Sequence, residues 1–320
     1  MNTLWNTLPS TLATQLTRRS LWGALPRTVQ PTPDGPKRLA LSFDLDYRED
    51  TIALTPLLEL LDRLSMPMTV FAIGKLVEQD PAPYARAAEA GHELGNHTWS
   101  HPDNPVLNPD REFWHLSEQE MREEIVRGQE AIEAGTGQRP TSFRTPHFKD
   151  AFRMMEALRA APEIDCISTT LASKCPVPTP YRPTRRERAG DLSLHFPADA
   201  GDTDAMSGPL MVPLTPCPGM RWSPFCSYSA IRIPRDPQRG AGLLDVAEWE
   251  RRWQRMLARA QRRRFASVYF DPIDVMRDEH TRAAFERMLR HARDTDWRVD
   301  TVRDVADAWR TVSVPALSTD

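Results

Sequence analysis

The feature that most constrains the fold is an alternation of strand-like and helix-like stretches along most of the 320 residues. Strand candidates, several of them apolar runs, occur at 39–44, 68–73, 92–97, 142–144, 164–168, 266–270 and 297–301. Between them lie helix-like stretches at 51–64, 82–90, 117–134, 245–263 and 281–294, and a last one that ends at Arg310. This alternation predicts an α/β protein with a parallel sheet covered by helices.

Segments of different composition bound this alternation. Residues 1–37, which end in the proline-rich stretch 31–36, are predicted to be an N-terminal extension and linker. Residues 38–312 are predicted to be one barrel domain with a loop-rich, proline-rich insertion at about 174–240, followed by a tail at 313–320. In a closed or nearly closed barrel, chemistry is expected at the carboxyl ends of the strands.

The overall composition excludes several classes of partner. A hydrophobic fraction of 40% and a net charge of -3 are typical of a soluble protein and give no indication of nucleic-acid or membrane-surface binding. No apolar run reaches the roughly 18 residues that a membrane span needs. The short apolar stretch at 20–25 is interpreted as a non-cleaved extension, with an atypical export signal as the alternative. Four cysteines without a CxxC pair favour reduced thiols and a cytoplasmic location. The oligomeric state stays open.

Two pairs of polar residues follow predicted strands. Asp44 and Asp46 are two positions apart after the first strand, and His97 and His101 are four apart after the third. On one helical turn, both imidazoles would face the same side and could reach one cation. With one carboxylate they would form a two-histidine, one-carboxylate site that stays open to water and substrate. Separately, each pair could be a structural or capping device, but their shared position at strand ends favours a metal site.

The second carboxylate and a nearby arginine have separate expected uses. One aspartate of the pair would bind the metal, while the other would stay free as the base that takes the proton of the attacking water. Arg144, after the fourth strand, could hold a carboxylate through two hydrogen bonds and keep it ionised. The alternative for Arg144 is a surface arginine before a turn proline.

The motifs SFDLD at 42–46, GHELGNHTWSH at 91–101 and FRTPHF at 143–148 together resemble the polysaccharide deacetylase family, the carbohydrate esterase family 4 group with the NodB homology domain. The resemblance extends over about residues 38–310 and implies an irregular (β/α) barrel. It also implies hydrolysis of an N-acyl group, usually N-acetyl, from an amino sugar by attack of a metal-bound water. The implied cofactor is one divalent ion, zinc first, with cobalt or nickel as alternatives.

By motif, the resemblance implies that Asp44 is the general base, oriented by Arg144. It implies that the metal ligands are Asp46, His97 and His101, and the residues Tyr47, Pro146 and His147 are expected to contact the substrate.

The chain departs from the family at its last motif. Asp271, in the sequence YFDP, stands where the family has a histidine that protonates the leaving amine. A carboxyl group can do this only when its pKa is raised by burial or by a neighbouring negative charge. His195, His147 or water are the alternatives. We therefore expect a metal-dependent amidohydrolase acting on an N-acylated amino sugar or related small molecule. The alternative is a carbohydrate-binding pseudoenzyme that has the fold and the metal site.

Aromatic residues of the predicted insertion could line a sugar site or close the loop core. Trp222, Phe225 and Tyr228 are the candidates, and core packing is favoured for them.

Overall fold

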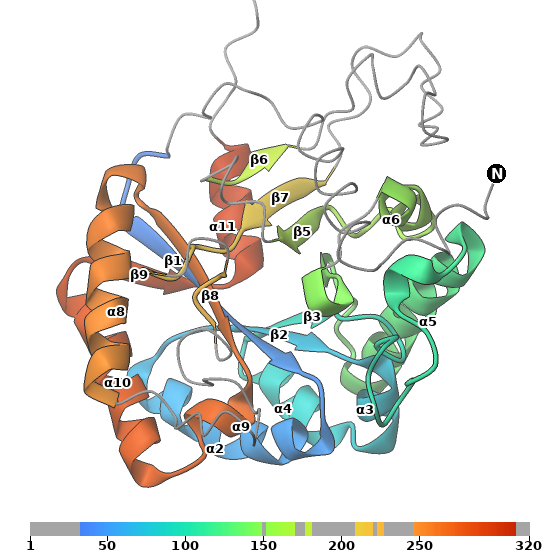
Figure 1. The fold of residues 1–320 in the computed structure, drawn as a ribbon, viewed down its shortest axis with the longest axis horizontal. Coiled ribbons are helices and arrows are strands. Elements are labelled where there is room, and N and C mark those ends of the chain that lie inside the picture. The colour runs from blue at the N-terminus through green and yellow to red at the C-terminus, as the bar shows by residue number, and fades with distance from the viewer. Residues whose placement is uncertain are drawn as a thin grey trace, which may run out of the picture.

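The computed structural model describes residues 33–148, 152–169, 177–180, 209–219, 223–226 and 246–311. In these ranges, strands curl into a nearly closed barrel with helices outside it (Figure 1). The strands are β1 (Lys37–Leu45), β2 (Thr69–Ala72), β3 (Glu93–Asn96), β4 (Ser142–Arg144), β5 (Cys166–Thr169), β6 (Thr179–Pro180), β7 (Leu210–Pro213), β8 (Phe265–Phe270) and β9 (Trp297–Asp300). The helices are α2 (Arg48–Leu64), α3 (Gly74–Gln79), α4 (Ala82–Glu89), α5 (Glu118–Thr136), α6 (Phe152–Ala157), α8 (Val246–Ala260), α9 (Pro272–Val275), α10 (Glu279–Asp294) and α11 (Val302–Arg310).

The strand order confirms the predicted parallel barrel. It runs β6-β7-β5-β4-β3-β2-β1-β8, with β9 also paired to β1. Each described pairing is parallel apart from the short antiparallel contact of β6 with β7. Strand β1 is central: its first half lies between β8 and β9, and its second half between β8 and β2. The side chains that follow β1 therefore lie near the middle of the barrel mouth.

The seven strands expected from the sequence are all present, with ends shifted by at most two residues. Three short helices were not expected: α3, α6 and α9 have six, six and four residues. Segments of this length span at most about two turns, too few for a helical period to be visible in the sequence.

The chain after β7 helps to close the barrel against β8. The backbone N–H of Thr215 donates to the carbonyl of Ser267 (2.8 Å), and the Ser267 N–H donates to Thr215 Oγ1 (2.9 Å). Further on, Cys226 forms a parallel bridge with Tyr269. Parts of the predicted insertion at 174–240 thus contribute to the barrel wall, while its other residues, like 1–32 and 312–320, lie outside the described ranges. The proposed division into domains stays a prediction.

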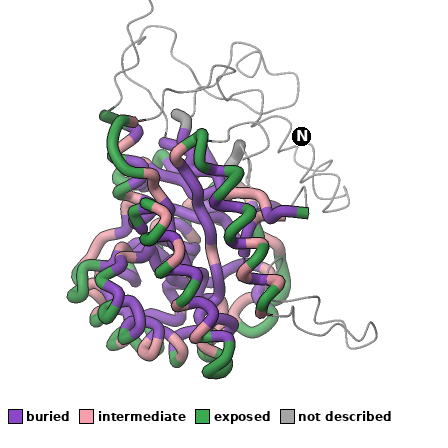
Figure 2. The backbone as a smooth tube through the Cα atoms, turned by 90° about the vertical axis from the view of Figure 1, so that its left-hand side faces the viewer, coloured by how far each residue is buried: buried purple, intermediate pink, exposed green. Residues whose placement is uncertain are grey.

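The core lies between the strands and the outer helices. Figure 2 shows buried backbone along the strands and exposed positions alternating along the helices. Helix α2 buries its row of leucines against the barrel, and α8 buries Trp249 and Trp253. Phe225 is fully buried, with its ring centroid 5.7 Å from that of Trp253 and 6.1 Å from that of Phe270. Core packing is therefore confirmed for Phe225, while Trp222 and Tyr228 lie outside the described residues.

Among the described residues, no helix combines the length and the apolar character that crossing a bilayer requires. The three described cysteines, Cys166, Cys217 and Cys226, are buried free thiols, in agreement with the expectation.

Candidate metal centre

The three predicted ligands converge at the barrel mouth. Asp46 follows β1, and His97 and His101 follow β3. Asp46 Oδ1 lies 3.5 Å from His97 Nε2 and 3.6 Å from His101 Nε2. Two atoms that ligate one zinc ion tetrahedrally at 2.0–2.2 Å are about 3.4 Å apart. The spacing therefore suits a single small cation.

The state of the ligand atoms also suits a cation. Asp46 Oδ1 is buried and has no hydrogen-bond partner, although buried polar atoms normally have one. Both histidine side chains are only 2% exposed. One carboxylate oxygen with two imidazole nitrogens is a donor set suited to zinc, cobalt or nickel. Within the described part of the chain, this is the one group of three or more His, Cys, Asp or Glu residues arranged to hold a metal.

Hydrogen bonding and charge set the state of each histidine. His97 Nδ1 lies 2.8 Å from the carbonyl oxygen of Arg144, which would accept a hydrogen bond from Nδ1–H and leave the Nε2 lone pair facing Asp46. Burial lowers the pKa of His101 to about 3 against the attraction of Asp46, so this ring is neutral. Burial also acts to lower the pKa of His97, but Asp44 and Asp46 outweigh it and raise that pKa. The same two histidines outweigh the effect of burial on Asp46 and lower its pKa.

The segment from His97 to His101 is not the helical turn expected from the four-residue spacing. Thr98 (φ 69°) and His101 (φ 49°) both have left-handed backbone conformations. This tight turn brings the two imidazole centroids within 4.8 Å of each other. The two imidazoles lie close together, as expected, but the helical geometry behind that expectation was wrong.

Helix α5 fixes this turn through hydrogen bonds. The Trp99 N–H donates to the Glu124 carbonyl (2.9 Å), and Ser100 donates from N and Oγ to the Glu124 carboxylate (2.8 and 2.7 Å). Asn96 accepts from the Thr98 N–H and donates to a carbonyl of α5, both at 2.8 Å. Backbone strain at a β-branched threonine is thus offset by tertiary hydrogen bonds.

Gly128 of α5 allows this close approach, and sequence reasoning did not identify it. A Cβ atom at Gly128 would lie 2.6 Å from Asn96 Oδ1 and 2.8 Å from the carbonyl carbon of Thr98. The only sequence signal is a glycine inside a predicted helix, where it lowers helix propensity.

Asp44 and Arg144 form a buried pair next to the candidate metal centre. Arg144 Nη1 donates to Asp44 Oδ1, while Nη2 donates to the hydroxyls of Ser42 and Ser168, each at 2.7 Å. Arg144 is fully buried, so the alternative of a surface arginine is wrong. The expected two-bond grip on the carboxylate is also absent, because the second nitrogen bonds the serines instead. Burial raises the pKa of Asp44, against the opposing effect of Arg144.

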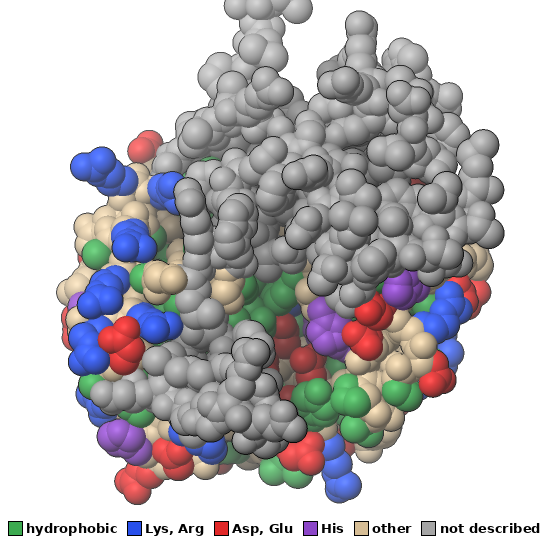
Figure 3. Space-filling model, viewed as in Figure 1, with side chains coloured by type: hydrophobic (Ala, Val, Ile, Leu, Met, Phe, Trp, Pro, Cys, Tyr) green, Lys and Arg blue, Asp and Glu red, His purple; other side chains and the backbone are tan. Residues whose placement is uncertain are grey.

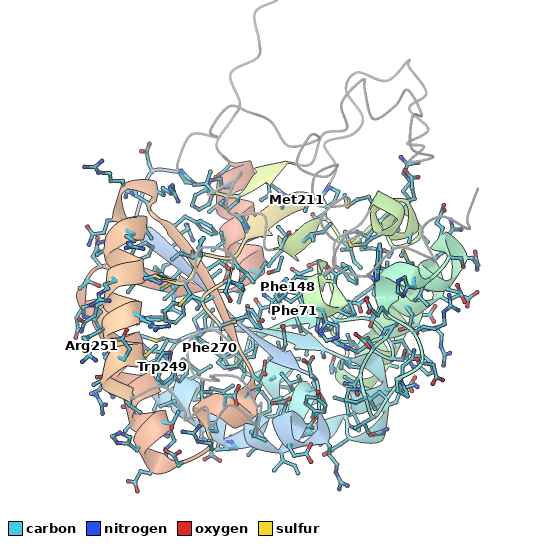
Figure 4. All side chains as sticks on the ribbon, viewed as in Figure 1. Phe71, Phe148, Met211, Trp249, Arg251 and Phe270 are labelled. Atoms are coloured by element: carbon cyan, nitrogen blue, oxygen red, sulfur yellow. The ribbon has the colours of Figure 1, made fainter. Side chains whose placement is uncertain are left out.

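Aromatic rings surround the Arg144 guanidinium. Its central carbon lies 4.0 Å from the ring centroid of Phe71, 5.0 Å from that of Tyr269 and 5.2 Å from that of Phe148. Phe71 and Phe148 are labelled near the centre of Figure 4. Arginine stacks well on such rings, so its position is fixed by packing as well as by charge.

The remaining predicted site residues lie around this centre. Asp44, inside β1, and Asp271, the first residue after β8, each follow a residue of the register pair Phe43–Phe270, so they lie at the same level of two neighbouring strands. Asp271 is only 6% exposed. His147, with φ 53°, has its ring 5.0 Å from that of His101 and its Nε2 3.5 Å from Asp103 Oδ2.

Of the other candidates, Pro146 is buried, Tyr47 is half-buried, and His195 lies outside the described residues. Figure 3 shows acidic side chains at the floor of a hollow on this face, with histidine side chains at its edge.

The fold and the site define a class of protein: a (β/α) barrel with a candidate metal centre and a buried carboxylate at the carboxyl ends of its strands. Residues 32–161 match the family model for polysaccharide deacetylase. This matched segment places residues 32–161 in the polysaccharide deacetylase family, as the motifs indicated.

Named relatives match a part of the chain of similar length. The peptidoglycan-N-acetylglucosamine deacetylase PgdA of Listeria monocytogenes is 31% identical over 137 residues, covering 42% of this chain and 27% of that protein. The peptidoglycan-N-acetylmuramic acid deacetylase PdaC of Bacillus subtilis is 33% identical over 120 residues, covering 38% and 23%. The matches thus span about a quarter of the length of these two relatives.

A solved structure supports the fold over nearly the whole chain. A putative polysaccharide deacetylase from Mycobacterium smegmatis superposes with a TM-score of 0.70 at 19% identity, covering 90% of this chain and 95% of that one. At this identity the likeness shows the fold alone.

Proposed function

We propose that this protein is a metal-dependent N-deacetylase, an amidohydrolase that removes the acetyl group from an N-acetylated amino sugar or a related compound. The observation that carries the proposal is the convergence of Asp46, His97 and His101 beside the buried Asp44–Arg144 pair. Membership of a family whose relatives are named as deacetylases supports the same reaction.

Asp46, His97 and His101 would hold the ion, with zinc as the first candidate and cobalt or nickel as alternatives. A bound divalent ion would lower the pKa of water and polarise the amide carbonyl. The chain supplies the orientation: the Arg144 carbonyl fixes the His97 ring, and α5 fixes the turn that carries both histidines.

Asp44 would accept the proton of the attacking water. Its carboxylate is buried and beside the ligand cluster, and its raised pKa makes it a stronger base than an ordinary aspartate. Arg144 keeps the carboxylate oriented, because one N–H bonds Asp44 and the others fix the guanidinium to Ser42 and Ser168.

Asp271 is proposed as the group that returns a proton to the leaving amine. It follows β8 at the level at which Asp44 lies in β1, so both could face the same substrate atoms. Tyr47, Pro146 and His147 are proposed to contact the substrate at the mouth, where Asp103 lies beside His147.

The substrate class is proposed from chemistry and from the names of the relatives. The names of PgdA and PdaC each mention an N-acetylated amino sugar as the group that is deacetylated. We propose an N-acetylated amino sugar, either free or within a glycan-like molecule, as the substrate of this chain. The cytoplasmic location expected from the sequence is proposed with it, and cell fractionation would test it.

Acetate release and metal content test the proposal together. The purified protein, its chelated form and the metal-reconstituted form are incubated with N-acetylated amino sugars and short oligosaccharides. We expect acetate release that chelation removes and metal restores. Asp44→Asn should lose at least about a hundredfold in kcat, since general base catalysis contributes about 10²–10⁴-fold, and should still bind metal.

Unchanged turnover in Asp44→Asn would sink the assigned base. Stoichiometric metal and sugar binding without acetate release would instead favour the pseudoenzyme alternative, which the aspartate at position 271 motivates.

A further inference from the structure

The main chain of Asp46 is held by side chains on both of its polar groups. Its N–H donates to Asp50 Oδ2 (3.2 Å), and its carbonyl oxygen accepts from Asn104 Nδ2 (2.7 Å). Asp46 lies one residue past the end of β1, so it has no ladder partner to fix its backbone. The two side chains therefore replace the sheet as the support for this candidate ligand.

Asp50 connects the loop of Asp46 with the loop of Asp271. Its side chain is fully buried. Oδ2 also accepts from the Tyr47 N–H (3.1 Å), and Oδ1 accepts from the N–H of Ile273, two residues after Asp271 (3.1 Å). A carboxylate that accepts several backbone N–H bonds forms strong, charge-assisted contacts. One side chain thus sets the distance between the ends of β1 and β8.

Asn104 connects the loop of Asp46 with the loop of His101. It is 1% exposed, and its backbone N–H donates to the His101 carbonyl (2.8 Å). Its side-chain oxygen accepts from the N–H groups of Val106 and Leu107 (2.9 and 3.0 Å), which leaves the amide nitrogen directed at Asp46. The orientation of this amide is therefore determined by bonds on both sides.

The simplest structural role for Asp50 is as a first-turn residue of α2, where an acidic side chain stabilises a helix N-terminus. That role needs neither the bond to Ile273 nor a counterpart on the Asp46 carbonyl. Asn104 belongs to no helix, and it bonds the backbones of two candidate ligands at once. Capping alone does not explain why two buried polar side chains from different segments meet at one residue.

We propose that Asp50 and Asn104 are positioning residues of the metal centre: they fix the Asp46 backbone so that Oδ1 faces the two histidine nitrogens before any ion binds. This inference rests on the proposed function only for the existence of the metal site. Neither side chain is a proposed ligand, so each acts through Asp46. Mutation of a residue that orients a metal ligand in this way typically weakens metal affinity by about 10- to 100-fold.

The test is a titration of the metal-free full chain with Co²⁺, followed by visible absorption, for wild type, Asp50→Asn and Asn104→Ala. Asp50→Asn preserves shape and removes one carboxylate oxygen, and Asn104→Ala removes the donor to Asp46. We expect the Co²⁺ dissociation constant to rise about 10- to 100-fold in each variant, with altered band intensities. The spectrum reports coordination geometry, which a purely structural role would leave unchanged.

Tyr84→Phe is the matched control. It removes the buried hydrogen bond between Tyr84 and Thr51 (2.8 Å), next to Asp50 on α2, and touches no bond of the Asp46 loop. Urea unfolding without metal measures the stability lost in each variant. The control should lose stability and keep wild-type Co²⁺ affinity within about twofold.

Wild-type affinity and spectrum in Asp50→Asn and Asn104→Ala would overturn the inference while leaving the proposed function standing. Equal weakening in Tyr84→Phe would also overturn it, since the effect would then be general destabilisation. A wild-type chain that binds no Co²⁺ would overturn both the inference and the metal-dependent function. If only one of the two variants folds by circular dichroism, that variant decides the result.

Discussion

At the residue scale, position 144 shows how one side chain meets several demands at once. The Arg144 charge is balanced by Asp44, its second nitrogen is bonded by Ser42 and Ser168, and its flat face packs on Phe71. Lysine offers neither a planar face nor a fork of donors, so it could not satisfy these contacts together.

Replacing Arg144 by Met should lower the free energy of unfolding by about 3–5 kcal/mol at neutral pH, because Asp44 would stay buried without its counter-charge. Urea unfolding in the presence of a chelator measures this without a contribution from bound metal. The double variant Asp44→Asn, Arg144→Met should recover part of the loss. A single-variant loss below about 1 kcal/mol would show that Asp44 is far better solvated than its burial indicates.

The site residues were largely predictable at this scale, and their supports were not. Spacing and strand-end position identified Asp44, Asp46, His97, His101 and Arg144. The bonds of Asp50 to Ile273 and of Asn104 to Asp46 join segments far apart in the sequence, and an aspartate or asparagine near a turn is ordinary in sequence.

At the element scale, α5 supports the turn from His97 to His101 through hydrogen bonds. The sequence predicted this helix to within two residues at its C-terminal end, together with its capping box at Ser117 and Glu120. It did not predict the turn, because the left-handed conformation of Thr98 is unfavourable for a β-branched residue and exists only through contacts with α5.

Gly128→Ala should push α5 and the turn from His97 to His101 apart. The added methyl would need a shift of Asn96 or of the Thr98 backbone, so we expect weaker Co²⁺ binding and a loss of about 1–3 kcal/mol in unfolding free energy. Gly135→Ala is the control on the same helix, because its Cβ would meet the Val77 side chain instead. Co²⁺ affinity and urea unfolding are measured in both variants. Equal Co²⁺ binding by the two variants would contradict this role of Gly128.

The N-cap of helix α10, away from the site, makes a contribution to the free energy of unfolding that depends on pH. The Thr281 N–H and the Arg277 guanidinium lower the pKa of the N-cap residue Asp278 from 3.8 to about 2. A carboxyl group with a lowered folded-state pKa stabilises the fold above its unfolded pKa, and that stability is lost as the pH falls from about 4 to about 2.

Asp278→Ala should therefore cost about 1 kcal/mol at pH 6 and less at pH 3. Urea unfolding of both proteins at the two pH values checks the sign. A cost that grew on acidification would mean that Asp278 does not stabilise α10 through its charge.

At the scale of the whole molecule, a bound metal would link the loops after β1 and β3 through Asp46, His97 and His101. A ligand that binds the native state alone stabilises it by about 2.7 kcal/mol at a free concentration of 100 times Kd. We therefore expect Zn²⁺ or Co²⁺ to raise the Tm by several degrees, as measured by calorimetry. Chelation should reverse the rise and His97→Ala should abolish it. An equal rise in His97→Ala would place the bound metal elsewhere.

The architecture was predictable at this scale because a long alternating pattern has few solutions. What could not be predicted was the barrel closure by residues 215 and 226, because their contacts with β8 are made by short segments without periodicity.

The central place of β1 has a consequence for the order in which the protein is made. Every candidate ligand lies before residue 102, yet β1 completes its pairing only with β8 and β9, and Arg38 meets Asp300 across 262 positions of sequence. At a synthesis rate of about 5–20 residues per second, one edge of this apolar strand waits on the order of 10–50 s for its partners. An unpaired edge is a template for aggregation. The candidate metal ligands thus leave the ribosome early and two strands that pair with β1 leave it late, so we expect β1 to be prone to aggregation in the nascent chain.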